Sequence, residues 1–92
     1  MIDTAAIWAQ LKAGDEHLNK TRAFLDVSRA FMELIDEKVG LTPDIELRHP
    51  ELTGFLMVHS RIVHASAEDS NIEPYLVDML ESYDDLVKRL SE

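Results

Sequence analysis

The sequence predicts an all-α fold: a compact helical bundle of three long helices plus a shorter N-terminal helix. Two observations predict it. Apolar residues recur three and four positions apart through most of the chain, and no segment of useful length alternates like a strand. Ninety-two residues are too few for two independent cores, so we expect a single helical-bundle domain over 1–92. Sparse glycines and prolines divide the helices: Gly14, Gly40, Pro43, Pro50, Gly54 and Pro74.

The first helix is expected from about Asp3 to Ala13. Asp3 is a suitable N-cap, because its short carboxylate can accept a hydrogen bond from an amide of the first turn. Ile2 and Ile7 have the spacing of a hydrophobic staple across that cap. Gly14 can end the helix in the left-handed conformation.

The second helix is expected from about Asp15 to Val39, closed by Gly40. Its apolar residues cover about half of the helix circumference, which is more than a helix with one wet side requires. We therefore expect this helix to meet two neighbours in its own chain, or one neighbour and a partner chain. The apolar set is Leu18, Phe24, Leu25, Val27, Phe31, Met32, Leu34, Ile35 and Val39.

A connector follows from Leu41 to His49. Thr42 and Pro43 fit an N-cap and a first helical position, which predicts a short helical turn there. Pro50 then starts a third helix that reaches about Ala67. Its apolar residues Leu52, Phe55, Ile62 and Val63 point one way, and Gly54 permits a close approach of another helix.

The final helix is expected to run to about Leu90. Ser70 and Glu73 have the spacing of a capping box, and Pro74 sits in the first turn, where a missing amide donor costs least. Alternating steps of four and three residues form a seam typical of helix–helix packing. The seam consists of Ile72, Leu76, Met79, Tyr83, Leu86 and Leu90.

The overall charge narrows the classes of partner. The chain has 18 acidic and 9 basic residues and a net charge of −9, so phosphate backbones and anionic lipid surfaces would repel it. No apolar run approaches the ~18 residues that span a bilayer. The first residues have no basic stretch followed by an apolar one, so we expect no signal peptide. The lack of cysteine fits a reducing compartment, and we expect a cytoplasmic protein.

Most of the negative charge lies in the C-terminal third. Between Ile62 and Val87 there are seven acidic residues and no lysine or arginine. Such acids either keep a small protein soluble or form a docking surface for a basic partner. Our leading hypothesis is the second: a protein-binding module, such as an adaptor, an inhibitor or an immunity-type regulator, which includes nucleic-acid mimics. The candidate partner-binding residues are Glu68, Asp69, Glu73, Val77, Asp78, Glu81, Asp84 and Asp85, with Met57 and Arg61 as further exposed contacts nearby.

Histidines are the natural candidates for chemistry in a chain without cysteine. His59 falls at the centre of the apolar face of the third helix, and the favoured interpretation is a hydrogen bond to a hydroxyl group. The alternative is a ligand or pH-sensing role in the small subunit of an enzyme. His64, one turn before Glu68, is expected in an exposed pair. The candidate hydroxyl partners of His59 are Thr21, Ser28, Tyr75 and Tyr83.

No catalytic, cofactor-binding or metal-binding residues are predicted. A carboxylate-bridged di-metal bundle needs inward glutamates and Glu-x-x-His motifs on two helices. The only such spacing joins Glu46 to His49 in the connector. We therefore expect a protein that is not an enzyme. The wide apolar face of the second helix or the seam of the last helix also predicts a homodimer, and a homo-oligomeric assembly protein without a charge-specific partner is the structural alternative.

Overall fold

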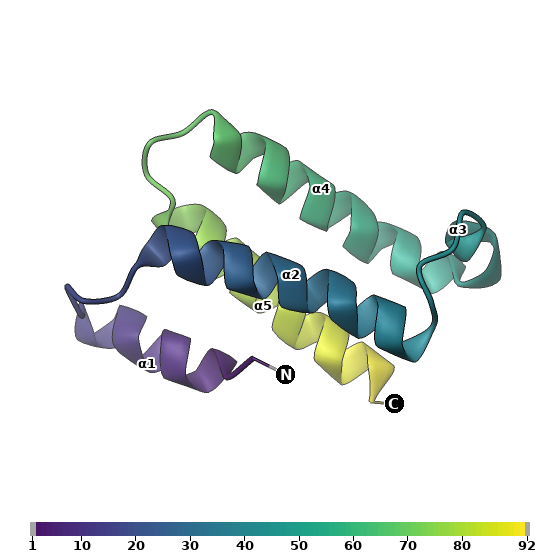
Figure 1. The fold of residues 1–92 in the computed structure, drawn as a ribbon, viewed down its shortest axis with the longest axis horizontal. Helices are drawn as coiled ribbons and strands as arrows, with labels where there is room; N and C mark the ends of the chain where they lie inside the picture. The colour runs from purple at the N-terminus through teal and green to yellow at the C-terminus, as the bar shows by residue number, and fades with distance from the viewer. Residues whose placement is uncertain (1, 92) are drawn as a thin grey trace.

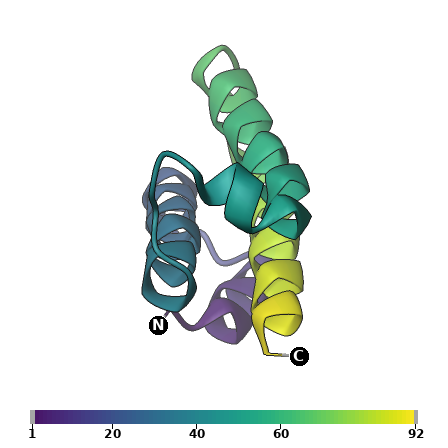
Figure 2. The same ribbon diagram turned by 90° about the vertical axis from the view of Figure 1, so that its right-hand side faces the viewer.

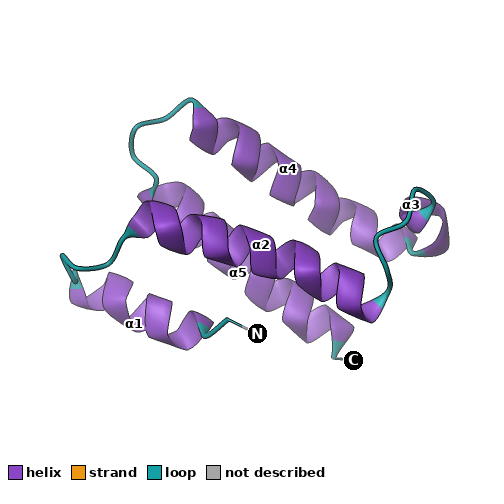
Figure 3. Ribbon diagram, viewed as in Figure 1, coloured by secondary structure: helices purple, strands orange, loops and turns teal. Residues whose placement is uncertain are grey.

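The computed structural model describes residues 2–91, so Met1 and Glu92, the ends of the expected domain, lie outside it. The described residues form α1 (Thr4–Ala13), α2 (Lys20–Lys38), α3 (Ile45–Arg48), α4 (Thr53–Ala67) and α5 (Glu73–Leu90), with a 3₁₀ turn, η1 (Pro50–Leu52), before α4. Figure 3 shows helices and loops and no strand over this range. The predicted all-α class is confirmed.

The caps of α1 are those that the sequence predicts. The Asp3 carboxylate accepts a hydrogen bond from the Ala6 amide at 3.1 Å. At the other end Gly14 adopts φ 65°, and its amide donates to the Leu11 carbonyl at 3.2 Å. A left-handed residue at this position is nearly free of strain only for glycine, which fixes the end of the helix.

Helix α2 begins later than predicted, because Asp15 and Asn19 compete with helical hydrogen bonding. The Asp15 carboxylate accepts from the His17 amide at 2.8 Å, a local turn that keeps this segment out of the helix. Asn19 then caps α2 by accepting from the Arg22 amide at 3.0 Å. The C-terminal prediction is confirmed: Gly40 has φ 83° and donates to the Ile35 carbonyl at 3.2 Å.

Two further helix starts differ from the predictions. Thr42 does not cap the turn in the connector, because α3 starts only at Ile45 after Asp44, whose carboxylate accepts from the Thr42 hydroxyl. Pro50 opens the 3₁₀ turn rather than α4, which starts at Thr53. A proline lacks the amide donor but fits such a tight first turn.

The predicted capping box of α5 is wrong. Helix α5 begins at Glu73, so Ser70 lies too far upstream to be its N-cap. Instead the Glu73 amide donates to the Asn71 side chain at 3.3 Å, and the Asn71 amide donates to Asp69 at 3.0 Å. Two consecutive side-chain turns therefore lead the chain into α5, and both are local alternatives to the capping box.

Helices α2 and α5 form the centre of the fold. They lie side by side and run in the same direction, whereas α1 and α4 run the opposite way (Figure 1). Viewed end-on, α2 lies on one side and α4 and α5 on the other, α1 fills the third side, and α3 spans from α2 toward α4 (Figure 2). Helix α4 packs mainly on α5.

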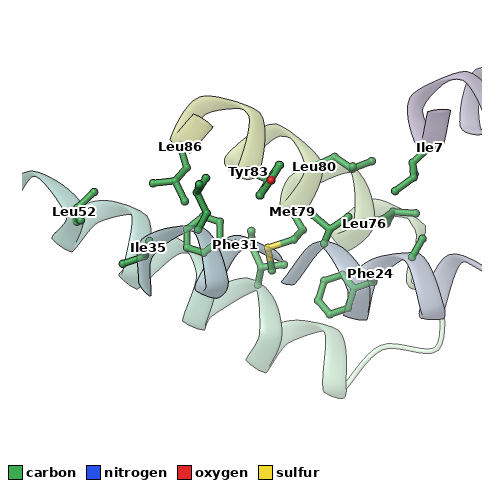
Figure 4. Packing of buried hydrophobic residues seen from close by; sticks show 14 of the residues in the cluster. Ile7, Phe24, Phe31, Ile35, Leu52, Leu76, Met79, Leu80, Tyr83 and Leu86 are labelled. Carbon is green, nitrogen blue, oxygen red and sulfur yellow. The ribbon is translucent and has the colours of Figure 1, made fainter. Parts of the chain in front are cut away.

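One hydrophobic cluster joins these helices (Figure 4). The predicted seam of α5 is confirmed at its centre, where Leu76, Met79, Tyr83 and Leu86 are buried. The prediction for α2 fails at Leu25, which is 53% exposed, because its neighbours leave that edge of the apolar face uncovered. The largest fully buried side chains are Val27, Phe31, Ile35, Leu52, Leu76, Met79, Leu80 and Leu86.

Helix α4 is the least covered of the long helices. Only Ile62 of its 15 residues is buried, although the helix is rich in apolar residues. Met57 is 58% exposed, and Val63 is 36% exposed although it was expected to share the covered face of Ile62. Across residues 2–91, no helix is long and apolar enough to cross a membrane.

Candidate functional site

A groove of about 530 Å³ runs between α4 and α5 and is open to solvent. Its volume lies within the range of ordinary ligand and side-chain pockets. Apolar residues from α4 and acidic residues from α5 face each other across it. The groove is lined by Glu51, Gly54, Phe55, Val58, Arg61, Ile62, Asp78, Glu81, Ser82 and Asp85.

The apolar side of the groove comes from α4. Phe55, Val58 and Ile62 follow one another at steps of three and four residues, so they share one face of the helix. Ile62 is buried against the core, whereas Phe55 and Val58 are only half-buried. The expected close approach of another helix at Gly54 is wrong, because nothing lies within 4 Å of the position a Cβ atom would take there. Apolar surface therefore remains available along the groove.

The opposite edge of the groove is acidic and comes from α5. Asp78, Glu81 and Asp85 are exposed and lie on one face of the helix at steps of three and four residues. At 1.5 Å per residue they extend over ~10 Å, nearly two helical turns. Ser82 is buried between them and the core. Three carboxylates beside an apolar surface make an electrostatically negative edge.

The ends of the groove are chemically different. Helices α4 and α5 run in opposite directions, so Arg61 lies toward the Asp78 end and Glu51 toward the Asp85 end. Arg61 is the single cationic residue among the groove-lining side chains. A basic ligand is therefore attracted along α5 and opposed at the Arg61 end.

The structure separates the eight predicted partner-binding residues into three groups. Asp78, Glu81 and Asp85 line the groove. Two of the others hold helices of the chain together: Glu73 pairs with Lys20 at 2.7 Å, and Asp84 accepts hydrogen bonds from α1. The remaining three lie outside the groove lining: exposed Glu68 and Asp69, and half-buried Val77.

Asp69 has its own local task. It accepts hydrogen bonds from the Asn71 amide at 3.0 Å and from the Tyr75 hydroxyl at 2.9 Å. The Asn71 amide bond, and then the Tyr75 bond, lower the pKa of the Asp69 carboxyl, because both favour its charged form. Asp69 therefore shapes the entry to α5.

The sequence predicts that Phe55 and Ile62 share one face of α4, and in the structure this face lines a groove with Asp78 and Asp85. Val58, Glu51 and Ser82 were missed altogether. One signal could have found Val58: it lies three residues after Phe55 and four before Ile62, so it shares their face of the helix. Arg61, predicted as a nearby contact, does line the groove.

The favoured interpretation of His59 is confirmed. Its Nε2 shares a hydrogen bond of 2.8 Å with the Ser28 hydroxyl, and its ring stacks on Phe31 with centroids 4.9 Å apart. Burial lowers the pKa of His59 and outweighs the effect of the Ser28 backbone, which raises it. His64 is exposed, as predicted, but it forms no ion pair or hydrogen bond with the described Glu68, so the expected pair is wrong. His59 thus joins α4 to α2 on the side away from the groove-lining acids.

Other parts of the molecule offer weaker sites. Within residues 2–91, no group of three or more histidine, aspartate or glutamate side chains is arranged to hold a metal ion. A second hollow, of about 340 Å³, lies along α2 beside Tyr83 and is lined by Asp26, Arg29, Glu33 and Glu37. With three acids and one arginine it is also negatively charged, but it is smaller than the groove between α4 and α5.

The chain matches none of the protein-family models, curated proteins or solved structures with which it was compared. The groove between α4 and α5 and the charges along it therefore carry the functional conclusion.

Proposed function

We propose that this chain is a protein-binding module that docks a basic surface of a partner protein in the groove between α4 and α5. One observation carries the proposal: exposed carboxylates of Asp78, Glu81 and Asp85 border an open apolar surface that the fold does not cover. Protein interfaces combine an apolar centre with a polar rim in this way.

The charge of the groove favours a cationic partner. Three of the seven acids between Ile62 and Val87 take part in contacts within the chain: Asp69, Glu73 and Asp84. The three along the groove edge are exposed and available to a lysine or arginine of another protein. Complementary charge speeds the encounter and selects the partner, while burial of apolar surface supplies most of the affinity.

The regulatory consequence depends on what the basic surface does when it is free. A module that covers a nucleic-acid-binding surface would inhibit it, with carboxylates in the places of phosphates, whereas one that joins two proteins would act as an adaptor. We place this encounter in the cytoplasm, because a chain without cysteine suits a reducing compartment.

The proposal is tested by capture from a native-host lysate with three baits. The first is the wild-type chain, and the second carries Asp78→Lys, Glu81→Lys and Asp85→Lys. The third carries Glu16→Lys, Glu33→Lys and Glu37→Lys, which replace exposed acids outside the groove. The second and third baits therefore have the same net charge. We expect a basic protein to be retained by the first and third baits only, and released at high salt.

Retention of the same proteins by all three baits would contradict the proposal, because net charge and groove charge would then have no role. Loss from both substituted baits would show that only the overall charge matters, which also contradicts a defined groove. Circular dichroism of each bait checks that the helices are retained.

The outer face of α4 supports a second candidate function, self-association. Met57, which is 58% exposed, adds apolar surface there, and α4 carries no acidic residue that would repel a second copy. We expect Met57→Lys to reduce such association. Light scattering at micromolar concentration tests it: a mass of 10.5 kDa, that of the monomer, would contradict this second candidate.

A further inference from the structure

We infer that the occupant of the groove is an amphipathic basic α-helix of the partner protein, lying along α5. This inference rests on the proposed function and goes further, because it names the kind of segment that binds. Two features of the groove carry it: the helical spacing of its acids and the matching spacing of its apolar residues.

The acids set the spacing of the partner's cations. Asp78, Glu81 and Asp85 repeat at three and four residues over ~10 Å. A helix lying alongside α5 presents its own side chains with the same repeat, so cations at positions i, i+3 and i+7 meet all three carboxylates together. An extended strand places side chains of one face ~7 Å apart, which does not match this repeat.

The apolar side of the groove receives the other face of the same helix. Phe55, Val58 and Ile62 also repeat at three and four residues, and they lie opposite the acids. Apolar side chains at helical spacing on the partner can therefore contact them while the cations contact α5. Binding of an amphipathic helix in an apolar groove uses anchors at this spacing.

A second copy of this chain does not fit the groove as well. The groove needs a helix with cations on one flank and apolar residues on the other. Helix α4 has one arginine, Arg61, and α2 places acids such as Asp26 and Glu33 among its cations. With a net charge of −9, two copies also repel each other at this edge.

The test uses two synthetic peptides of 18 residues, the length of α5. The first places leucines on one helical face and lysines beside them at i, i+3 and i+7. The second has the same composition in shuffled order, so its charge is equal and its amphipathic face is lost. Calorimetry measures the binding of each peptide to the full chain at low ionic strength.

Matched variants on α4 and α5 locate the contact. Val58→Ser removes apolar surface inside the groove, and Val63→Ser makes the same change at an exposed α4 residue outside the groove lining. The variant with lysine at Asp78, Glu81 and Asp85 removes the acidic edge. Circular dichroism confirms that each variant keeps its helices.

We expect the amphipathic peptide to bind about tenfold more tightly than the shuffled one. We also expect Val58→Ser to weaken the binding of the amphipathic peptide and Val63→Ser to leave it unchanged. Equal binding of both peptides, weakened by the α5 lysines, would overturn the inference and leave the proposed function standing.

Other outcomes are equally decisive. If neither peptide binds, or if the α5 lysines change nothing, both the inference and the proposed function fail. A solution mass twice the 10.5 kDa of the monomer, restored to 10.5 kDa by Val58→Ser, would show that a second copy fills the groove and would overturn the inference.

Discussion

The indole Nε1 of Trp8 donates a hydrogen bond to the Asp84 carboxylate at 3.0 Å, and so ties the first helix to the last. The second carboxylate oxygen of Asp84 accepts from the Thr4 hydroxyl at 2.9 Å. Both donors lie on α1, and the acceptor is half-buried on α5. This acid therefore stabilises the fold, in contrast to the exposed Asp85 next to it.

Replacing Asp84 tests that assignment. We expect Asp84→Ala to lower the free energy of unfolding by about 1–3 kcal/mol, because two part-buried donors lose their acceptor. Trp8 is the only tryptophan, so its fluorescence reports on α1 alone. Its emission should move to longer wavelength as the indole meets water. The matched change Asp85→Ala should leave stability and emission unchanged, and equal effects of the two variants would contradict this role.

Two leucines that differ in burial should differ in their contribution to stability. Leu76 is fully buried between α2 and α5, and Leu25 is 53% exposed. We expect Leu76→Ala to cost about 2–5 kcal/mol, since it leaves a cavity in the core. Leu25→Ala should change the free energy of unfolding by less than ~0.5 kcal/mol. Urea titration measures both, and a large cost at Leu25 would show that its face is covered in solution.

His59 predicts a pH dependence of stability. Burial holds its pKa below the ordinary value of 6.5, so the unfolded chain takes up a proton at higher pH than the folded chain. Stability from the neutral imidazole, held between Ser28 and Phe31, is therefore complete above about pH 6.5 and decreases as the pH falls through the folded-state pKa.

The substitution His59→Gln isolates this effect, because glutamine can bond to Ser28 but does not titrate. We expect the wild-type urea midpoint to fall between about pH 7 and about pH 5 by more than the midpoint of the variant. The exposed His64 provides a matched control: His64→Gln should keep the wild-type profile. Parallel profiles for wild type and His59→Gln would contradict the prediction.

Removal of Arg61 should increase the affinity of the groove for a basic peptide. It is the cation in the groove lining, so it repels a basic partner at the Asp78 end. We expect Arg61→Ala to tighten binding of the amphipathic lysine peptide about fivefold, corresponding to a repulsion of ~1 kcal/mol between like charges near 4 Å in water. Arg22→Ala removes the same charge from the exposed side of α2 and should have little effect. Weaker binding after Arg61→Ala would contradict this orientation of the partner.

Much of the fold could be predicted from the sequence because it depends on local signals. The Asp3 cap, the left-handed Gly14 and Gly40 and the buried centre of the α5 seam follow from short-range spacing. The starts of α2 and α5 could not be predicted as well. Each start depends on which of several short polar side chains accepts a hydrogen bond from the backbone amides of the first turn. At α2 that acceptor is Asn19.

The site was only partly predictable for a different reason. The acid-only stretch indicates a docking surface, but periodicity alone does not distinguish Asp84 from Asp85. Their roles differ because α1 packs on one side of α5 and α4 on another, a long-range arrangement. The groove also depends on the separation between α4 and α5. The residue pattern of either helix alone does not predict this separation.

The measurement that tests the central claim most directly is a titration of the amphipathic lysine peptide into the ¹⁵N-labelled chain, followed by amide chemical shifts. The claim predicts that the largest changes lie on both sides of the groove. Those amides belong to Phe55, Val58, Ile62, Asp78, Glu81, Ser82 and Asp85. Changes confined to α1 and the outer face of α2, with these amides unmoved, would contradict it.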